Sequence, residues 1–275
     1  MNSFTRWTAA TAILGSTIVG STLITEVRTF ALPDDQVVQK LQSVPVFTIA
    51  DDKGIPLVAT NKDQAGNQTS SVAGVFMSKS DAQGFMDRLK KQNPNIAKNV
   101  RVTPVSLGEI YKIAQNQTQK DKLTFAFVPK EQQVTSAQSL LRENGQKVEE
   151  FNGVPLFVAK AGKEQGYLTI QQGNQQIIPF FFDKEQLEGM VNNFKKQKPE
   201  LASTVKVQVI NLEGFIQALK SKNNPELSQV VLVPSTESLQ FLQSLQSTPG
   251  NNQPARANNQ RQRTTNQNTN KPKRR

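Results

Sequence analysis

The alternation of apolar and polar positions between residues 74 and 113 predicts two helices separated by a strand. Apolar residues recur at helical spacing over residues 82–89 and at every second position over residues 100–105. Pro94 marks the end of the first helix, because proline cannot continue a helix. Ser106 stands just before the second helix and is suited to cap it. This stretch therefore predicts one supersecondary unit of helix, strand and helix.

The same pattern returns 105 positions later, over residues 179–219. Glycine, proline and apolar positions keep one register in the two stretches. Equivalent pairs include Gly84 and Gly189, Pro94 and Pro199, Val102 and Val207, and Leu107 and Leu212. Low-complexity sequence would not hold one register through all three kinds of position, so we interpret the pattern as an internal duplication. The two mid-helix glycines, which are unfavourable in a helix, predict close packing against a neighbouring element.

Each copy extends on both sides into further strands and a last helix. The first copy adds strands over residues 44–50, 55–59 and 123–129 and a helix over 134–143; the second adds strands over 154–160, 167–171 and 230–234 and a helix over 239–245. Residues 61–71 are polar and predict a loop, and residues 32–42 predict a short leading helix. We therefore predict an α+β fold with two copies of a β-β-β-α-β-α-β-α unit, over residues 41–145 and 151–246.

The first 31 residues carry the features of a secretory signal peptide. Arg6 precedes an apolar run over residues 7–24, and Ala31 lies in a small-residue exit. The alternative is a membrane anchor, since the run has 18 residues. We expect an exported protein whose mature chain begins near Leu32 and contains the duplicated domain, residues 32–246.

Residues 247–275 differ in composition from the rest of the chain. They contain no apolar residue larger than alanine or proline, no acidic residue, and 7 of the chain's 33 cationic residues. Such a segment cannot bury enough surface to offset its ordering entropy, so we predict a disordered basic tail. The remaining residues between the leader and the tail hold 24 basic and 21 acidic side chains, so the net charge of +11 belongs mainly to the tail.

The side chains of most enzyme sites are missing from this chain. It contains no histidine and no cysteine, which excludes the usual general base, the thiol nucleophile and thiolate metal ligands. Asp51 and Asp52 lie in a turn that favours aspartate for backbone reasons, and capping accounts for Ser106 and Glu109. We therefore predict no catalytic residue, no metal and no cofactor, and a protein that is not an enzyme.

Aromatic and methionine side chains gather where a strand leads into the first helix of each copy. Phe180, Phe181 and Phe182 are consecutive, and neighbours along a strand face opposite sides. Either both faces of the sheet are covered, or one face lies in an open groove that binds polypeptide. The groove hypothesis expects its lining residues to be exposed; the candidates are Phe76, Phe85, Leu107, Ile110, Phe180, Met190, Leu212 and Phe215.

Three runs carry a resemblance to a known family: VPVFTIADDKGIPLV from residue 44, VAGVFMSKSDAQGFMDRLKKQNP from residue 72, and VRVTPVSLGEIYKI from residue 100. Together with the repeat, they resemble the Tic twenty-two family, which comprises an intermembrane-space component of the chloroplast protein import machinery and its cyanobacterial relatives. The resemblance extends over about residues 41–245.

The resemblance implies a two-lobed, pseudo-twofold α+β protein, with helices covering its sheets and with apolar pockets related by the duplication. It also implies that the protein acts as a chaperone or adaptor for unfolded or outer-membrane precursor polypeptides, together with the outer-membrane assembly and translocation machinery. The leader resembles a bacterial export signal, which favours the periplasm, with the thylakoid lumen as the alternative. Other interpretations are a structural or membrane-tethering protein that uses the tail on an anionic membrane surface, and an unrecognised envelope enzyme. A nucleic-acid binder is a further alternative, but we expect no nucleic-acid partner, because the folded part lacks a basic face with interleaved aromatic residues.

Overall fold

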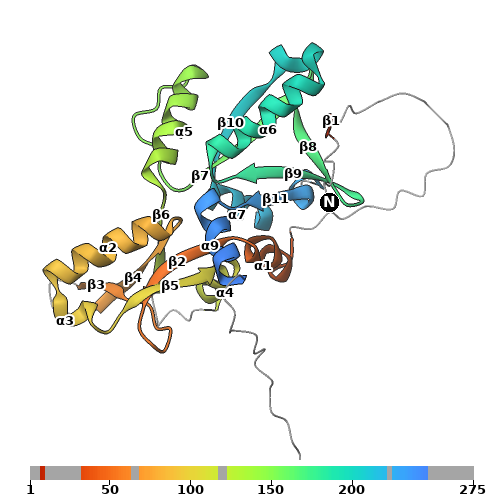
Figure 1. Cartoon of the computed structure of the whole chain (residues 1–275). Coiled ribbons are helices and arrows are strands. Elements are labelled where there is room, and N and C mark those ends of the chain that lie inside the picture. Colours follow the sequence, from red (N-terminus) through yellow and green to blue (C-terminus); the bar gives the residue numbers. More distant parts are fainter. Residues whose placement is uncertain (1–6, 10–31, 63–67, 117–122, 222–224, 247–275) are drawn as a thin grey trace, which may run out of the picture.

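The computed structural model describes residues 7–9, 32–62, 68–116, 123–221 and 225–246. It contains two mixed sheets, one from each copy, with helices between and around them (Figure 1). The predicted disordered tail and nearly all of the predicted leader lie outside the described residues. Of the leader, only β1 (Trp7–Ala9) is described, and it pairs antiparallel with a strand of the second sheet.

The first sheet contains β2 (Pro45–Ala50), β3 (Val58–Lys62), β4 (Gln68–Phe76), β5 (Arg101–Ser106) and β6 (Leu123–Val128). Strand β4 is central, because it pairs in parallel with β6 and antiparallel with both β2 and β3. Strand β5 joins the other side of β2. The helices of this part of the chain are α1 (Asp34–Gln42), α2 (Lys79–Gln92), α3 (Pro94–Ala97), α4 (Leu107–Gln115) and α5 (Glu131–Glu143).

The second sheet repeats this topology. Its strands are β7 (Pro155–Ala161), β8 (Gly166–Gln172), β9 (Gln175–Phe181), β10 (Lys206–Asn211) and β11 (Val230–Val233), and its helices are α6 (Lys184–Gln197), the 3-10 helix η1 (Pro199–Thr204), α7 (Leu212–Ser221), α8 (Pro225–Gln229) and α9 (Thr236–Gln246). Strand β9 pairs in parallel with β11, as β4 does with β6. The predicted order of elements is confirmed, with α3, η1 and α8 as short additions.

Two sequence expectations in the first copy are wrong. Residues 55–59 do not form the partner strand of β2, since β3 begins only at Val58 and pairs with β4. A single bridge joins Ala50 to Pro56, and proline lacks the N–H that a longer ladder would need. The predicted polar loop over 61–71 also contains the start of β4, whose Gln68, Ser70 and Ser71 pair with β3.

Alternate side chains of each sheet pack into different cores. In β9 and the residue after it, Phe180 and Phe182 enter a central core that both copies share, while Phe181 enters an outer core beneath α6. In β2, Val46 faces the central core and Phe47 faces the outer core of the first sheet. The interpretation that both sheet faces are covered is therefore confirmed, and it accounts for the run of phenylalanines.

The last helix of each copy covers the sheet of the other copy (Figure 1). Helix α5 follows β6 of the first sheet, yet its Ala137 and Leu140 pack with Phe157 of β7. Helix α9 follows β11 of the second sheet, yet its Phe241 packs edge-on against Phe47 of β2, with ring centroids 5.2 Å apart. The two copies therefore exchange helices, and neither forms a separate domain.

Polar contacts at the first turns of α2 and α6 fix this exchange. On the first sheet, the carboxylate of Glu237 accepts hydrogen bonds from the backbone N–H and the hydroxyl of Ser80, at 2.7 and 3.2 Å. On the second sheet, Glu185 accepts from the side-chain amides of Gln132 and Gln133, at 3.1 and 2.8 Å. Each sheet thus has a hydrogen-bonded contact with the exchanged helix at the same place.

Candidate functional site

Helices α4 and α7 are equivalent in the duplication and lie side by side at its pseudo-twofold axis. Helix α4 begins with a capping box, in which the Ser106 hydroxyl accepts from the Glu109 N–H and the Glu109 carboxylate accepts from the Ser106 N–H. At the other end, Lys220 Nζ donates to Gln115 Oε1 at 3.1 Å. These two residues are 105 positions apart, which is the repeat offset, so equivalent positions of the two copies meet here.

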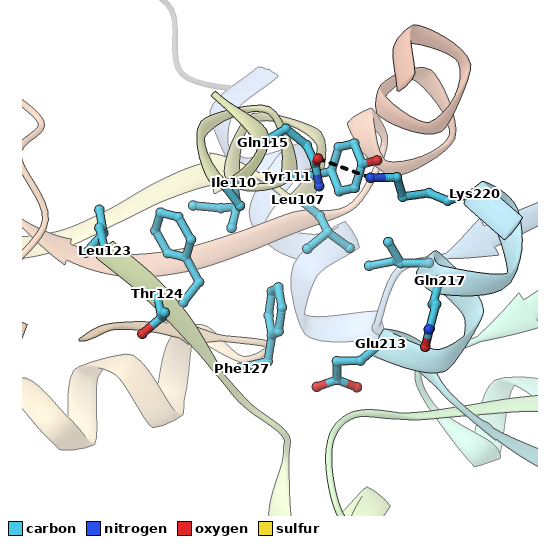
Figure 2. Close-up of a pocket in the computed structure, with 13 residues that line it drawn as sticks. Leu107, Ile110, Tyr111, Gln115, Leu123, Thr124, Phe127, Glu213, Gln217 and Lys220 are labelled. Atoms are coloured by element: carbon cyan, nitrogen blue, oxygen red, sulfur yellow. Dashed lines mark hydrogen bonds between the residues drawn. The ribbon is translucent and has the colours of Figure 1, made fainter. Parts of the chain in front are cut away.

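A pocket of about 480 Å³ lies between α4, α7 and β6 (Figure 2). Its walls are mainly apolar and aromatic: Leu107, Ile110, Tyr111 and Ala114 from α4, Leu123, Phe125 and Phe127 from β6, and Ile216 from α7. The polar residues that line it are Gln115, Thr124, Glu213, Gln217 and Lys220. This size and composition are typical of sites that bind apolar groups and orient them through a few polar ones.

Several polar groups of the pocket already bind neighbouring groups. The Tyr111 hydroxyl donates to Asp34 Oδ1 at 2.8 Å, and burial together with this carboxylate raises the pKa of Tyr111. Glu213 Oε2 accepts from the Val154 N–H at 3.2 Å. Lys220 lies 3.8 Å from Asp34 as well as donating to Gln115. Hydrogen bonding and burial of apolar groups are therefore the chemistry that this pocket offers.

The structure does not gather the eight predicted site residues in exposed grooves. Leu107 and Ile110 line the pocket, with Leu107 fully buried and Ile110 4% exposed. The other six lie outside it: Phe180, Leu212 and Phe215 in the central core, Met190 in the outer core of the second sheet, and Phe76 with the half-buried Phe85 in that of the first. The expectation that these residues are exposed is wrong, since seven of the eight are buried and Phe85 is half-buried, because helices cover both faces of each sheet.

Sequence reasoning missed most of the pocket wall. Leu123, Phe125 and Phe127 of β6 alternate with the exposed Thr124 and Ala126, which is the pattern of a strand with one apolar face. That pattern could have shown one wall. The contribution of α7 could not have been read in the same way, because it depends on how the two copies pack together.

Neither a metal cluster nor a membrane-spanning helix is found in the described part of the chain. Its residues include no group of three or more acidic, histidine or cysteine side chains that could hold a metal ion. The described helices include none that is both long and apolar enough to cross a membrane.

Two proteins from Arabidopsis thaliana are similar at low identity. Protein TIC 22-like, chloroplastic is 23% identical over 207 residues, which are 74% of this chain and 61% of that protein. Protein TIC 22, chloroplastic is 22% identical over 219 residues, which are 79% of this chain and 74% of that protein. The chain thus spans less than two thirds of the length of the first relative.

Two solved structures share the fold. Anabaena Tic22, described as a protein of protein transport, matches with a TM-score of 0.70 and 35% identity, over 79% of this chain and all of that one. Tic22 from Plasmodium falciparum matches with a TM-score of 0.58 and 21% identity, over 76% of this chain and 97% of that one, which shows the common fold alone. The sequence model of the Tic22-like family matches residues 5–244. The resemblance found in the sequence is confirmed, and the chain belongs to the Tic22-like family.

Proposed function

We propose that this protein is a non-enzymatic chaperone or adaptor in protein transport, and that it holds apolar segments of unfolded or outer-membrane precursor polypeptides in the pocket between α4, α7 and β6. The observation that carries the proposal is the pocket itself, which is apolar-walled, about 480 Å³ in volume and formed by both copies. The description of Anabaena Tic22 as a protein-transport protein supports the same role.

The setting that fits this role is the periplasm, with the thylakoid lumen as the alternative, and the partners are precursor chains and the outer-membrane assembly machinery. The leader-like first 31 residues support export, and the two Arabidopsis relatives are chloroplastic. The seven cationic residues of the 247–275 segment would add attraction to an anionic membrane surface, which salt would weaken.

The test uses two neighbouring positions of α4. Ala114 is exposed and lines the pocket, whereas Ile113 is 48% exposed and lies outside it. We expect Ala114→Arg to reduce the suppression of aggregation of an unfolded outer-membrane protein, because an entering apolar segment would have to desolvate the guanidinium. Ile113→Arg adds the same charge one residue away and should leave the suppression unchanged.

Both variants should keep the native free energy of unfolding within about 0.5 kcal/mol, because each changes an exposed position. Equal activity of the two variants, or failure of the native protein to hold any client soluble, would show that this pocket is not the holding site. Leu107 and Ile110 belong to its wall but also to the central core, so their substitution would confuse binding with unfolding.

A further inference from the structure

Helix α1 lies against α4, α7 and β11. Its Val37 and Leu41 are fully buried. Gly108 of α4 is so close to α1 that a Cβ atom there would lie 2.7 Å from the Val38 carbonyl oxygen. Lys40 Nζ donates to the carbonyl oxygens of Ser228 and Val230, at 2.7 and 3.0 Å. Further polar contacts with this segment come from Tyr111 and Lys220, which bind Asp34, and from the Leu219 carbonyl, which accepts from Leu32 N–H.

The pocket is the pseudo-symmetric equivalent of the site that binds α1, which we call the seat of α1. Shifted by the repeat offset of 105, the six residues that hold α1 fall on six residues that line the pocket. Gly108, Tyr111, Leu219, Lys220, Ser228 and Val230 become Glu213, Ile216, Ala114, Gln115, Leu123 and Phe125. The second copy has no counterpart of α1, since residues 144–154, which precede β7, form no helix. The duplication therefore supplied two seats and one helix.

We propose that the pocket receives a short amphipathic helix of another polypeptide, seated as α1 is seated on the other side of the axis. The inference rests on the proposed function and says which conformation the bound segment adopts. The seat of α1 gives the pattern: two aliphatic side chains four residues apart, as at Val37 and Leu41, with a lysine or arginine just before the second, as at Lys40. An amphipathic helix in an apolar groove is a common mode of peptide recognition.

The lysine or arginine of the bound helix is expected because the edge strand turns a backbone carbonyl toward the pocket. The Val233 carbonyl points to β9, because it accepts from the Phe182 N–H. Carbonyls three positions apart along a strand point in opposite directions, so the Val230 carbonyl points away from β9, where it accepts from Lys40. In the first sheet, the Val128 carbonyl accepts from Met77 N–H, so the equivalent Phe125 carbonyl is turned outward beside the pocket. A cation on the bound helix would be placed to donate to this carbonyl, as Lys40 does to that of Val230.

One residue makes the two seats different. Where Gly108 allows α1 to approach closely, the pocket has Glu213. The bound helix must therefore lie farther from α7 than α1 lies from α4. The position that corresponds to Val38 should be small or basic, so that it meets a carboxylate without a clash or with an ion pair.

Disulfide trapping can test this geometry cleanly, because the chain contains no cysteine. The probe is a synthetic peptide with the sequence of residues 32–43 and the change Val38→Ala, which carries one cysteine placed in turn at successive positions. It is mixed with the full chain carrying Gln217→Cys at the pocket or, as the control, Lys112→Cys at the equivalent place beside the seat of α1. High peptide concentration is needed, since a helix this short is marginal in water.

We expect the yield with the Gln217→Cys chain to peak at every third or fourth peptide position, roughly the period of 3.6 residues of a helix. Ala114→Arg should lower the yield about tenfold, because it places a charge where the anchors enter, and Ile113→Arg should change it less than about twofold. Peptides with serine at the positions of Val37 and Leu41 should lose the reaction.

Other outcomes overturn the inference in distinguishable ways. A period of two would mean that the peptide adds to β6 as an extended strand. Preferential reaction with the Lys112→Cys chain would mean that the peptide displaces α1 from its own seat. A disulfide yield that Ala114→Arg does not change would mean that the peptide binds outside the pocket. If the peptide does not react while an unfolded client is still held, the helix is wrong and the proposed function stands; loss of client holding would remove the proposed function itself.

Discussion

The two exchanged helices occupy equivalent places and hold them by different means. Helix α9 contacts the first sheet through one large ring, because Phe241 packs against Phe47. Lys79 Nζ lies 4.9 Å from the centroid of the Phe241 ring. Helix α5 reaches the second sheet with the smaller Ala137 and Leu140. The duplicated fold therefore preserves the position of the exchanged helix but not the side chains that hold it there.

The hydrogen bonds at this place also differ between the two copies, because donor and acceptor are exchanged. Glu237 of the exchanged helix is the acceptor on the first sheet, and the equivalent residue, Gln132, is a donor on the second. Their partners are reversed too, because Ser80 donates and the equivalent Glu185 accepts. A glutamine amide can donate, so Gln132 can meet the carboxylate of Glu185, which a second carboxylate at this place could not do.

The largest expected effect comes from the apolar contacts between the exchanged helices and the sheets. Phe47 and Phe157 are equivalent and fully buried, so Phe47→Ala and Phe157→Ala should each lower the free energy of unfolding by about 3–5 kcal/mol. In a double-mutant cycle, Phe47 and Phe241 should couple by about 0.5–1.5 kcal/mol, measured by urea denaturation. Leu245→Ala is the control on the same helix, because Leu245 is 54% exposed. Absence of coupling would mean that α9 does not hold the first sheet.

A smaller effect should follow from removing the carboxylate that α9 brings to α2. Glu237→Gln weakens the contact to Ser80 and removes a negative charge from the first turn of a helix, whose dipole favours it. We expect a loss of about 1 kcal/mol in the free energy of unfolding. The exposed Gln240→Ala, one turn along α9, should have almost no effect. If both changes have the same effect, the contact does not contribute to stability.

The smallest effect is a pH dependence confined to the second sheet. Burial alone would raise the pKa of Glu185, but hydrogen bonds from Gln133 and its own backbone, with Lys130 and Lys184 nearby, outweigh it and lower the pKa. A lowered folded-state pKa contributes stability above the ordinary value of 4.5 and loses it as the pH falls through the folded value. The advantage of the native chain over Glu185→Gln should therefore shrink below pH 4.5 in acid unfolding measurements. An advantage that stays constant with pH would contradict the assigned contacts.

Local pattern predicted most of the fold, because helix and strand periods, prolines and caps act over a few residues. Ser78 caps α2 as its position predicts, with its hydroxyl accepting from the Asp81 N–H. The equivalent Asp183 does not cap α6; it accepts instead from Thr236 N–H at the start of the exchanged helix α9. The close packing predicted from Gly84 and Gly189 is also wrong, since a Cβ atom at Gly189 would meet nothing within 4 Å.

The candidate site was harder to predict than the fold. Its walls come from β6 of one copy and from the equivalent helices of both, and only the packing of the copies brings Ile216 beside Ile110. Sequence reasoning selected large apolar residues at the ends of strands, and these fill cores wherever a helix covers them. A residue such as Ala114, small and exposed, has no sequence signal that distinguishes it from an ordinary surface alanine.

The exchange of helices also sets the order in which the protein can finish folding during synthesis. Ser238 of α9 contacts the Pro45 carbonyl, 193 positions earlier in the chain. Residues 129–246 follow the last strand of the first sheet, so at ribosomal rates of about 5–20 residues per second this sheet waits roughly 6–24 s for α9 to be complete. Until then only α2 and α3 can cover the face that carries Phe47. A chain in that state exposes apolar surface, so its first sheet is prone to aggregate until α9 has been made.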